Sequence, residues 1–451
     1  MTSRNLTTGS IPHHVRALAV PSAIGLVFQT MYNVVDSFYA GQVSTTALAA
    51  LGLSFPVYLL LIATSGGLSR GSSALIANAI GERNQERQQR YSRQCLSLGL
   101  LMALTVTATG LTVARPLFTV LGASGDYLEY AVQYMTPIFL GAVFFVVTSV
   151  CNAMLIANGD SRTFSKILVV GFFANLVLDP WFLRGGFGLP AMGIAGIAWA
   201  TVAIQCANLC VMLSIVVRRG LVDLKPWKAL LPDWRTYREI LNQAVPASFA
   251  IMSVALGFFG ITYFLTVYGK PTVAAFGVAT RIEQMALLPT LGLYSAIMAL
   301  VGQNNGAKDF GRVRESMRVC NRAGWGLVLC TSSLIFVFAE PLVGAFTDDP
   351  EVISIGVVYV HIAAVIQWSY VMTSTHLAFL QAMKRPRYCY FESPLRRVLL
   401  PLPLLWYFSV KRNYDVEYIW YSIAVTNVVM TFITVFYAQR IIGKLDNSVA
   451  T

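Results

Sequence analysis

Residues 194–217 read IAGIAWATVAIQCANLCVMLSIVV, an unbroken run without one charged side chain. At 1.5 Å per residue, a helix of this length spans the roughly 30 Å hydrocarbon core of a bilayer. Similar apolar runs recur at 96–113, 132–156 and 419–437, with a shorter one at 327–338. Helices that are apolar on every side are too numerous here for one water-soluble core. The sequence therefore predicts an integral membrane protein that crosses the bilayer many times.

The composition agrees, because 56% of the residues are hydrophobic and only 12% are charged. An average soluble domain carries about twice that charged fraction. We expect an all-α protein with twelve transmembrane helices. Their predicted ranges are 15–40, 48–80, 91–116, 126–157, 161–183, 193–219, 237–268, 272–304, 313–340, 351–383, 390–410 and 415–441.

The net charge of +12 arises from basic residues that cluster in alternate loops. The loops between them are short or acidic, as at Asp126 and Glu129. This asymmetry follows the positive-inside rule and predicts a multi-pass protein of the cell (inner) membrane with both termini in the cytoplasm. It argues against nucleic acid as a partner. The basic loop residues are Arg83, Arg87, Arg90, Arg93, Arg162, Lys166, Arg218, Arg219, Lys225, Lys228, Arg235, Arg238, Lys308, Arg312, Arg314, Arg318, Arg322, Lys384, Arg385, Arg387, Arg396 and Arg397.

The chain matches itself when it is shifted along its own length so that Pro21 falls on Pro246. This shift, called the repeat offset below, also pairs Gly67 with Gly292, Arg87 with Arg312, Arg93 with Arg318 and Pro116 with Pro341. It spans six predicted helices, an even number, so the halves share one orientation and are related by an axis along the membrane normal. We expect two six-helix bundles: an N-lobe at 1–219, a cytoplasmic linker at 220–236 and a C-lobe at 237–451.

Carboxylates away from the predicted helix ends are scarce: Asp36, Asp179 and Glu283. An ionised acid in mid-helix costs about 2.5–3.5 kcal/mol on insertion scales, so each one needs an explanation. Asp36 falls opposite Ile261 in the repeat and is therefore not part of the shared scaffold. We interpret Asp36 as a protonatable carboxylate that faces a cavity. The alternative is a side chain that reaches the membrane interface.

Asn175 and Asp179 lie one turn apart on one face of the helix predicted at 161–183. Pro180 frees a backbone carbonyl one turn earlier, and such disruptions often line a cavity. The alternative for Asp179 is a helix-end cap. We expect Asp36, Asn175 and Asp179 to form one hydrogen-bonded network inside the first half.

The third acid, Glu283, follows Arg281 by two residues, and we interpret the two as a pair that neutralises itself. Arg70, His361 and His376 are also predicted to lie within the membrane, and the sequence gives them no role. The seven cysteines form no CxxC pair, so we expect neither a metal site nor a bound cofactor.

Further polar residues accompany Asp36 in the first half. Pro21 lies about four turns before it and can hinge the helix, since proline removes one backbone hydrogen bond. We expect four side chains to line a substrate cavity, although such a residue taken singly more often joins two helices. These are Gln29, Tyr32, Asn33 and Asn152.

With these features the sequence resembles the multidrug and toxic compound extrusion (MATE) transporters. The resemblance rests on the two six-helix repeats, the acid late in helix 1 and the Asn-x-x-x-Asp spacing in helix 5. It also includes GIAGIAWAT at 193–201 and ATRIEQ at 279–284. The helix 5 and helix 8 motifs are similar to those of the DinF-like branch. The NorM-like branch is expected to carry acids in helices 7 and 10, but 239–268 contains only Glu239 and 352–383 contains none.

This resemblance implies that Asp36 is the coupling carboxylate and that Asn175 and Asp179 are its partners. It further implies that Tyr134 and Thr201 complete the network and that helix 1 bends at Pro21. We therefore expect a non-enzymatic, monomeric antiporter that uses protons to export amphipathic, cationic or aromatic drugs by alternating access.

Two alternatives share the fold: sodium coupling at the same site, and a flippase for lipid-linked saccharides. An intramembrane protease would need paired catalytic acids or a His-Glu-x-x-His site, and the sequence has neither. A channel would need a filter-like loop, and none is evident in the sequence.

Overall fold

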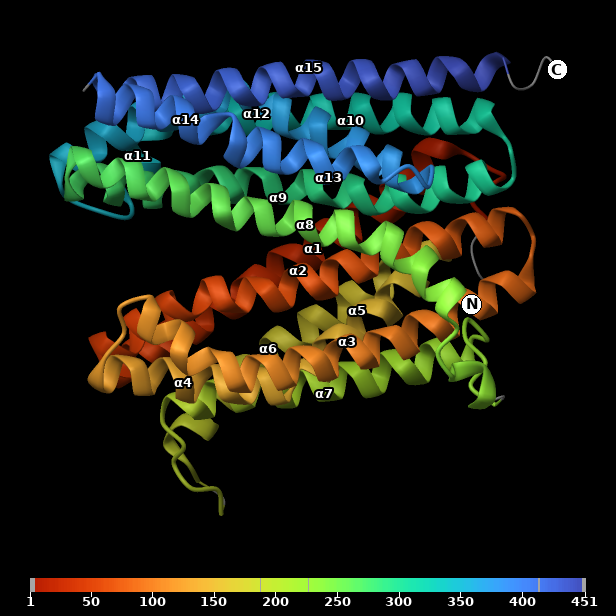
Figure 1. Ribbon diagram of the computed structural model, residues 1–451, viewed down its shortest axis with the longest axis horizontal. Coiled ribbons are helices and arrows are strands. Elements are labelled where there is room, and N and C mark those ends of the chain that lie inside the picture. The colour runs from red at the N-terminus through yellow and green to blue at the C-terminus, as the bar shows by residue number, and fades with distance from the viewer. Residues whose placement is uncertain (1–4, 187, 226, 413, 448–451) are drawn as a thin grey trace. The chain divides into compact units, whose positions relative to one another are not determined.

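The computed structural model describes residues 5–186, 188–225, 227–412 and 414–447. Long α-helices run side by side, and no β-strand forms within the described residues (Figure 1). The α-helices are α1 Ile11–Val43, α2 Thr45–Gly81, α3 Gln85–Val120, α4 Gly125–Leu140, α5 Ala142–Ala157, α6 Arg162–Arg184, α7 Ile194–Arg218, α8 Trp234–Leu265, α9 Lys270–Gly306, α10 Phe310–Val337, α11 Ala339–Gly344, α12 Pro350–Ala382, α13 Arg387–Pro394, α14 Pro401–Trp406 and α15 Glu417–Asn447. Two 3₁₀ turns, η1 Trp227–Leu230 and η2 Thr266–Tyr268, and two π-helical turns, η3 Leu395–Leu399 and η4 Tyr407–Lys411, complete the described elements.

Ten of the described helices are long and apolar enough to cross a membrane. An eleventh span consists of α4 and α5, which meet at Gly141 with a bend of 49°. The single straight helix predicted at 126–157 is therefore bent. Pro137, in the turn before Gly141, has no backbone N–H and so weakens the helix at this point.

The helix predicted at 390–410 is not continuous, and this prediction was wrong in detail. The chain there consists of α13, η3, α14 and η4 in succession. Pro401 has no backbone N–H, so the carbonyl of Arg397 cannot receive the usual helical hydrogen bond. The backbone widens instead, and the N–H of Leu400 donates to the carbonyl of Leu395 at 2.9 Å, five residues back.

The chain forms two compact units. Ile24–Ser248 makes up most of the first unit, and the second contains Leu6–Ala23 together with the chain from Phe249 onwards. The boundaries between these units do not lie in the predicted linker at 220–236. One falls inside α1 and the other inside α8. These two boundaries, after Ala23 and after Ser248, are themselves separated by the repeat offset. The division therefore follows the repeat.

The repeat extends to local backbone geometry. Arg83, after α2, and Lys308, after α9, are equivalent in the repeat, and both adopt the left-handed conformation, with φ of 54° and 59°. The residue that follows each of them caps the next helix. Asn84 Oδ1 accepts from the N–H of Arg87, and Asp309 Oδ1 accepts from that of Arg312. At equivalent positions in the two halves, the chain thus reverses direction through a left-handed residue followed by a side-chain cap of the next helix.

Close helix crossings repeat as well. In the first unit, a Cβ added to Gly67 of α2 would lie 2.6 Å from the backbone nitrogen of Ser248 in α8. In the second unit, a Cβ added to Gly292 of α9 would lie 2.2 Å from the carbonyl oxygen of Ala19 in α1. Only glycine allows backbones to approach this closely. The two crossings place the starts of α8 and α1 in equivalent positions within their units.

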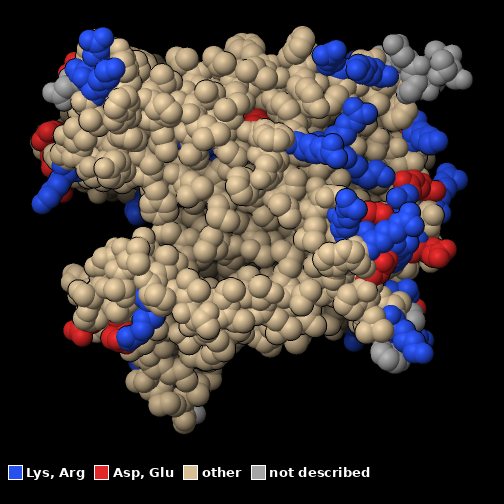
Figure 2. Space-filling model, in the orientation of Figure 1, with Lys and Arg blue, Asp and Glu red and all other residues tan. Residues whose placement is uncertain are grey.

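Charge is distributed as the bilayer requires. On the face drawn in Figure 2, the Lys, Arg, Asp and Glu side chains of each unit gather at the ends of the helices, and the stretch between is almost entirely uncharged. Large apolar side chains such as Leu104, Phe173 and Phe432 remain exposed. Exposed apolar surface of this extent marks a protein that meets lipid.

Candidate coupling site

Asp36 lies within the first unit near the end of α1, and its side chain is 3% exposed. Three neighbouring helices each supply one hydrogen bond to its carboxylate. Tyr134 Oη of α4 donates to Oδ2 at 3.0 Å, Thr201 Oγ1 of α7 donates to the same oxygen at 3.4 Å, and Asn175 Nδ2 of α6 donates to Oδ1 at 3.3 Å. Asp36 is therefore a buried junction of four helices. Its burial excludes a side chain that reaches the membrane interface.

A second acid completes the cluster. Asn175 Nδ2 also donates to Asp179 Oδ1 at 2.7 Å, one turn further along α6. Asp179 is 0% exposed, and α6 continues past it to Arg184, so it does not cap a helix end. The structure thus brings together all five residues predicted for the coupling network.

Two oxygens in this cluster lack a donor. Asn175 Oδ1 and Asp179 Oδ2 are buried and accept no hydrogen bond from any described residue. Asp36 and Asp179 also lie close enough to interact electrostatically. Buried acceptor oxygens without donors are costly, and two like charges in one apolar site repel each other. A positive species bound between them, a proton or a small cation, relieves both costs.

The four residues predicted to line a substrate cavity do not share one environment. Gln29 and Asn33 are exposed on α1, and Asn152 on α5 is half-buried. Tyr32 is buried, and its Oη donates to the carbonyl of Leu168 at 3.2 Å. Tyr32 therefore joins α1 to α6, which is the alternative considered for such residues. The role of the other three stays a prediction.

Pro21 lies within α1, which continues through it to Val43. It is two residues from the point where α1 passes from the second unit to the first. A helix position with a missing backbone hydrogen bond thus lies beside a boundary between compact units. The hinge itself stays a prediction.

The predicted pair of Arg281 with Glu283 was wrong. Glu283 is 8% exposed on α9, and its Oε2 accepts a hydrogen bond from Tyr359 Oη of α12 at 2.9 Å. Arg281 is exposed and forms no ion pair with a described residue. Residues two apart on a helix face different directions, so spacing alone argued against the pair. The repeat offset could have revealed the true partner of Glu283. It makes Tyr359 the counterpart of Tyr134, which donates to the buried acid of the first half.

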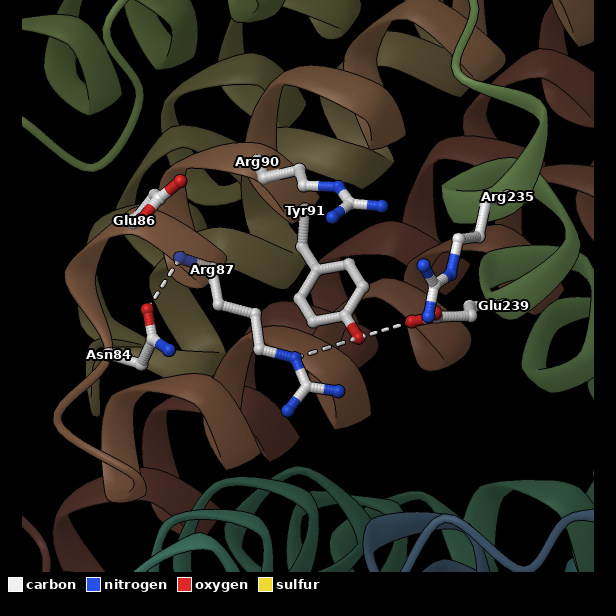
Figure 3. Close-up of a pocket in the computed structure, with 7 residues that line it drawn as sticks. All are labelled: Asn84, Glu86, Arg87, Arg90, Tyr91, Arg235 and Glu239. Atoms are coloured by element: carbon white, nitrogen blue, oxygen red, sulfur yellow. Dashed lines mark hydrogen bonds between the residues drawn. The ribbon is translucent and has the colours of Figure 1, made fainter.

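A separate charged pocket of the first unit lies between the starts of α3 and α8 (Figure 3). Its volume is about 310 Å³. Tyr91 Oη donates to Glu239 Oε2 at 2.5 Å, and Arg87 Nε donates to Tyr91 Oη at 3.2 Å. Arg90 adds an ion pair with Asp233 at 2.9 Å. These bonds anchor the start of α8 to α3. The lining residues are Asn84, Glu86, Arg87, Arg90, Tyr91, Arg235 and Glu239.

A two-fold helical repeat with a buried acid cluster in one half defines a class of secondary transporters. The MatE family model matches residues 21–181 and again 246–403, and the starts of these matches are separated by the repeat offset. The chain belongs to this family, the MATE multidrug efflux transporters, and is a transporter rather than an enzyme. Eleven spans lie among the described residues, and the broken segment from α13 to η4 takes the place of the twelfth. The predicted all-α fold of twelve helices in two bundles is confirmed.

Curated relatives extend over most of the chain. It is 27% identical over 436 residues to an "FAD transporter" of Shewanella oneidensis, covering 94% of this chain and 93% of that protein. It is 29% identical over 370 residues to a "Probable multidrug resistance protein NorM" of Thermotoga maritima, covering 79% and 77%. A solved structure titled "Outward-facing conformation of a multidrug resistance MATE family transporter of the MOP superfamily" is 25% identical. The match covers 99% of this chain and 100% of that one, with a TM-score of 0.89.

Proposed function

We propose that the protein is a proton-coupled antiporter that exports small amphipathic compounds, with the coupling proton held by Asp36 and Asp179. The main support is the pair of buried oxygens without donors, Asn175 Oδ1 and Asp179 Oδ2. A proton on Asp179 turns one carboxylate oxygen into a donor and removes one negative charge from the cluster. Proton binding therefore changes both the hydrogen bonding and the charge of the site.

The geometry suggests how a proton moves a helix. Asp36 belongs to α1, whereas its donors Tyr134, Thr201 and Asn175 belong to α4, α7 and α6. Hydrogen bonds to a charged carboxylate are about twice as strong as neutral ones, so neutralising Asp36 loosens α1 from three helices at once. Pro21 then offers a bending point. Bending of α1 closes the cavity of the first half and expels substrate.

The direction of transport and the substrate class rest on other observations. The basic loops favour an inner-membrane protein with both termini in the cytoplasm, so protons enter from outside and substrate leaves. The family and the multidrug relative favour amphipathic, cationic or aromatic drugs. The relative named as an FAD transporter adds aromatic anions to this range. The Asn175–Asp179 spacing favours the DinF-like branch, and we expect a monomer.

Sodium is the second candidate for the coupling ion, and the same two oxygens favour it. A hard cation prefers carboxylate and amide oxygens, and it would lie where Asn175 Oδ1 and Asp179 Oδ2 lack donors. The choice between the two ions needs an experiment, because both suit the same oxygens.

The test is export of a fluorescent cation, rhodamine 6G, by purified protein in phosphatidylcholine vesicles. We expect an imposed proton gradient to drive export and Asp36→Asn to reduce it to background. Asp348→Asn, which alters an exposed acid outside the network, is the matched control and should transport normally. Export driven by a sodium gradient at constant pH would transfer the assignment to sodium. Full proton-driven export by Asp36→Asn would remove Asp36 from the mechanism.

A further inference from the structure

The second unit contains its own carboxylate–tyrosine pair, Glu283 with Tyr359. Tyr359 is the repeat counterpart of Tyr134, so both tyrosines occupy the same position in their halves and both donate to a buried acid. The acids do not correspond, because Glu283 falls on Tyr58 in the repeat. The carboxylate of this pair is therefore not part of the repeated scaffold, and the coupling mechanism proposed for the first half does not use it.

Two arginines lie next to each other in η3, and one of them is fully paired. Arg396 is 5% exposed, its Nε donates to Glu392 Oε1 at 2.5 Å, and its Nη1 donates to Asn427 Oδ1 at 2.9 Å. The other oxygen of Glu392 accepts from Ser393 Oγ at 3.0 Å. All these groups are buried. The charge of Arg396 is thus neutralised within the helix bundle, and the pair is closed to further partners.

Arg397 is different. Its guanidinium makes no hydrogen bond and no ion pair with any described residue, and the residue is half-buried. It lies within electrostatic range of Glu283 and Tyr370. The nitrogens of Arg397 and the oxygens of Glu283 are nevertheless not within the 4.0 Å of an ion pair. A positive and a negative group thus lie within electrostatic range of each other without an ion pair between them.

The backbone holds Arg397 in this position. Pro401 releases the carbonyl of Arg397, and that carbonyl lies against α8, where a Cβ on Gly257 would come within 2.7 Å of it. The π-helical turn η3 includes Arg397 itself. Single π-turns are frequent at functional sites, and irregular backbone at membrane depth is tolerated only inside protein or beside a cavity. Arg397 therefore lies on irregular backbone at membrane depth that packs closely against α8.

We propose that Arg397 binds the anionic group, a carboxylate or phosphate, of an aromatic substrate, with Glu283 and Tyr359 fixing the opposite side of the site. A guanidinium presents a planar fork of N–H donors that matches these groups in two parallel hydrogen bonds. Arg397 has all its donors available, whereas Glu283 already accepts from Tyr359. The site thus adds acidic compounds to the transported range. This inference rests on the proposed export function and refines its substrate class.

Two dyes that differ by one carboxyl group provide the test. Rhodamine B carries a free carboxylate, and rhodamine B ethyl ester is the same dye with that group esterified, so that it is cationic. We expect Arg397→Gln to weaken rhodamine B binding and export by about tenfold to a hundredfold, the range for losing a charge-assisted bidentate contact. Binding and export of the ethyl ester should change less than about threefold. Arg397→Lys keeps the charge and should recover part of the loss. Arg281→Gln, an exposed arginine on α9 in the same unit, is the matched control.

The outcomes separate this proposal from its rivals. Equal loss of both dyes by a folded Arg397→Gln protein, or equal retention of both, overturns it. A dependence on Arg397 that appears only after anionic phosphatidylglycerol is added to phosphatidylcholine vesicles also overturns it, because the site then serves a lipid headgroup. Rhodamine 6G export by the unaltered protein, lost in Asp36→Asn, tests the proposed function separately.

Discussion

The two halves share a tyrosine that donates to a buried acid, but they surround that acid differently. In the first unit Asp36 has a second acid, Asp179, beside it, and its hydrogen-bond donors are neutral. In the second unit Glu283 lies in the field of Arg397. A site with two acids can change its charge by binding one cation, whereas a site with opposite charges is already balanced. The two halves thus carry different charge arrangements on one repeated scaffold.

The largest expected difference concerns stability and lies in the second unit. Glu392→Gln leaves the buried Arg396 without its counter-charge, and breaking such a pair costs about 3–5 kcal/mol. We expect a correspondingly lower free energy of unfolding in detergent by chemical denaturation. Glu340→Gln, at an exposed acid, should change it by less than about 0.5 kcal/mol. If both variants were equally stable, Arg396 and Glu392 would not be a structural pair.

The corresponding change in the first unit should affect transport rather than stability. Asp179→Asn removes one of two neighbouring acids, so the fold loses a repulsion and not a counter-charge. We expect proton-driven rhodamine 6G export to fall by about tenfold to a hundredfold, with no decrease in unfolding free energy. Asp348→Asn should change neither quantity. Normal export by Asp179→Asn would mean that Asp36 carries the proton without a partner.

A third comparison uses the two equivalent tyrosines. Tyr134→Phe removes a hydrogen bond to Asp36, and bonds to charged groups contribute about 1.5–3 kcal/mol. We expect proton-driven rhodamine 6G export to fall by about tenfold. Tyr359→Phe is the matched control from the other half, and its effect on the same export should stay under about threefold. Equal losses from the two substitutions would show that both halves couple to protons.

The smallest expected effect lies outside the membrane, in the loop between α5 and α6. Burial alone would raise the pKa of Asp160, but the Thr163 hydroxyl and the Arg219 guanidinium bond to its carboxylate and hold the pKa below its ordinary value. Its repeat counterpart is Arg385, so the second half lacks this contact. The lowered pKa stabilises the fold at pH above about 4, and this contribution is lost as pH falls through the folded-state value.

Asp160→Asn should therefore lower the free energy of unfolding at neutral pH by about 0.5–1 kcal/mol. The measurement is chemical denaturation of both proteins across a pH series. The difference between them should shrink as the pH falls below about 4. A difference that grows on acidification would contradict the assignment of this ion pair.

Much of the fold and of the candidate site could be predicted from the sequence. The physical reasons for this also explain which predictions failed. Asp36, Asn175 and Asp179 were identifiable because a carboxylate inside an apolar helix is costly and a four-residue spacing fixes a common face. The Glu283 contact was missed because the nearest opposite charge in the chain, Arg281, points elsewhere. Arg397 was assigned to a basic loop, since sequence does not reveal that prolines widen the helix and turn this side chain inward. The bond of Tyr32 to the Leu168 carbonyl could not be predicted either, because sequence does not show which backbone a hydroxyl reaches.

The central claim is that the acids of the first unit, and not Glu283, take up the coupling proton. Infrared difference spectra between neutral and acidic pH test it directly, because a protonated carboxyl group has its own stretching band. We predict a band that appears on acidification of the unaltered protein, is lost or shifted in both Asp36→Asn and Asp179→Asn, and persists in Glu283→Gln. A band that survives in both aspartate variants and disappears in Glu283→Gln would place the coupling proton in the other half and contradict the account.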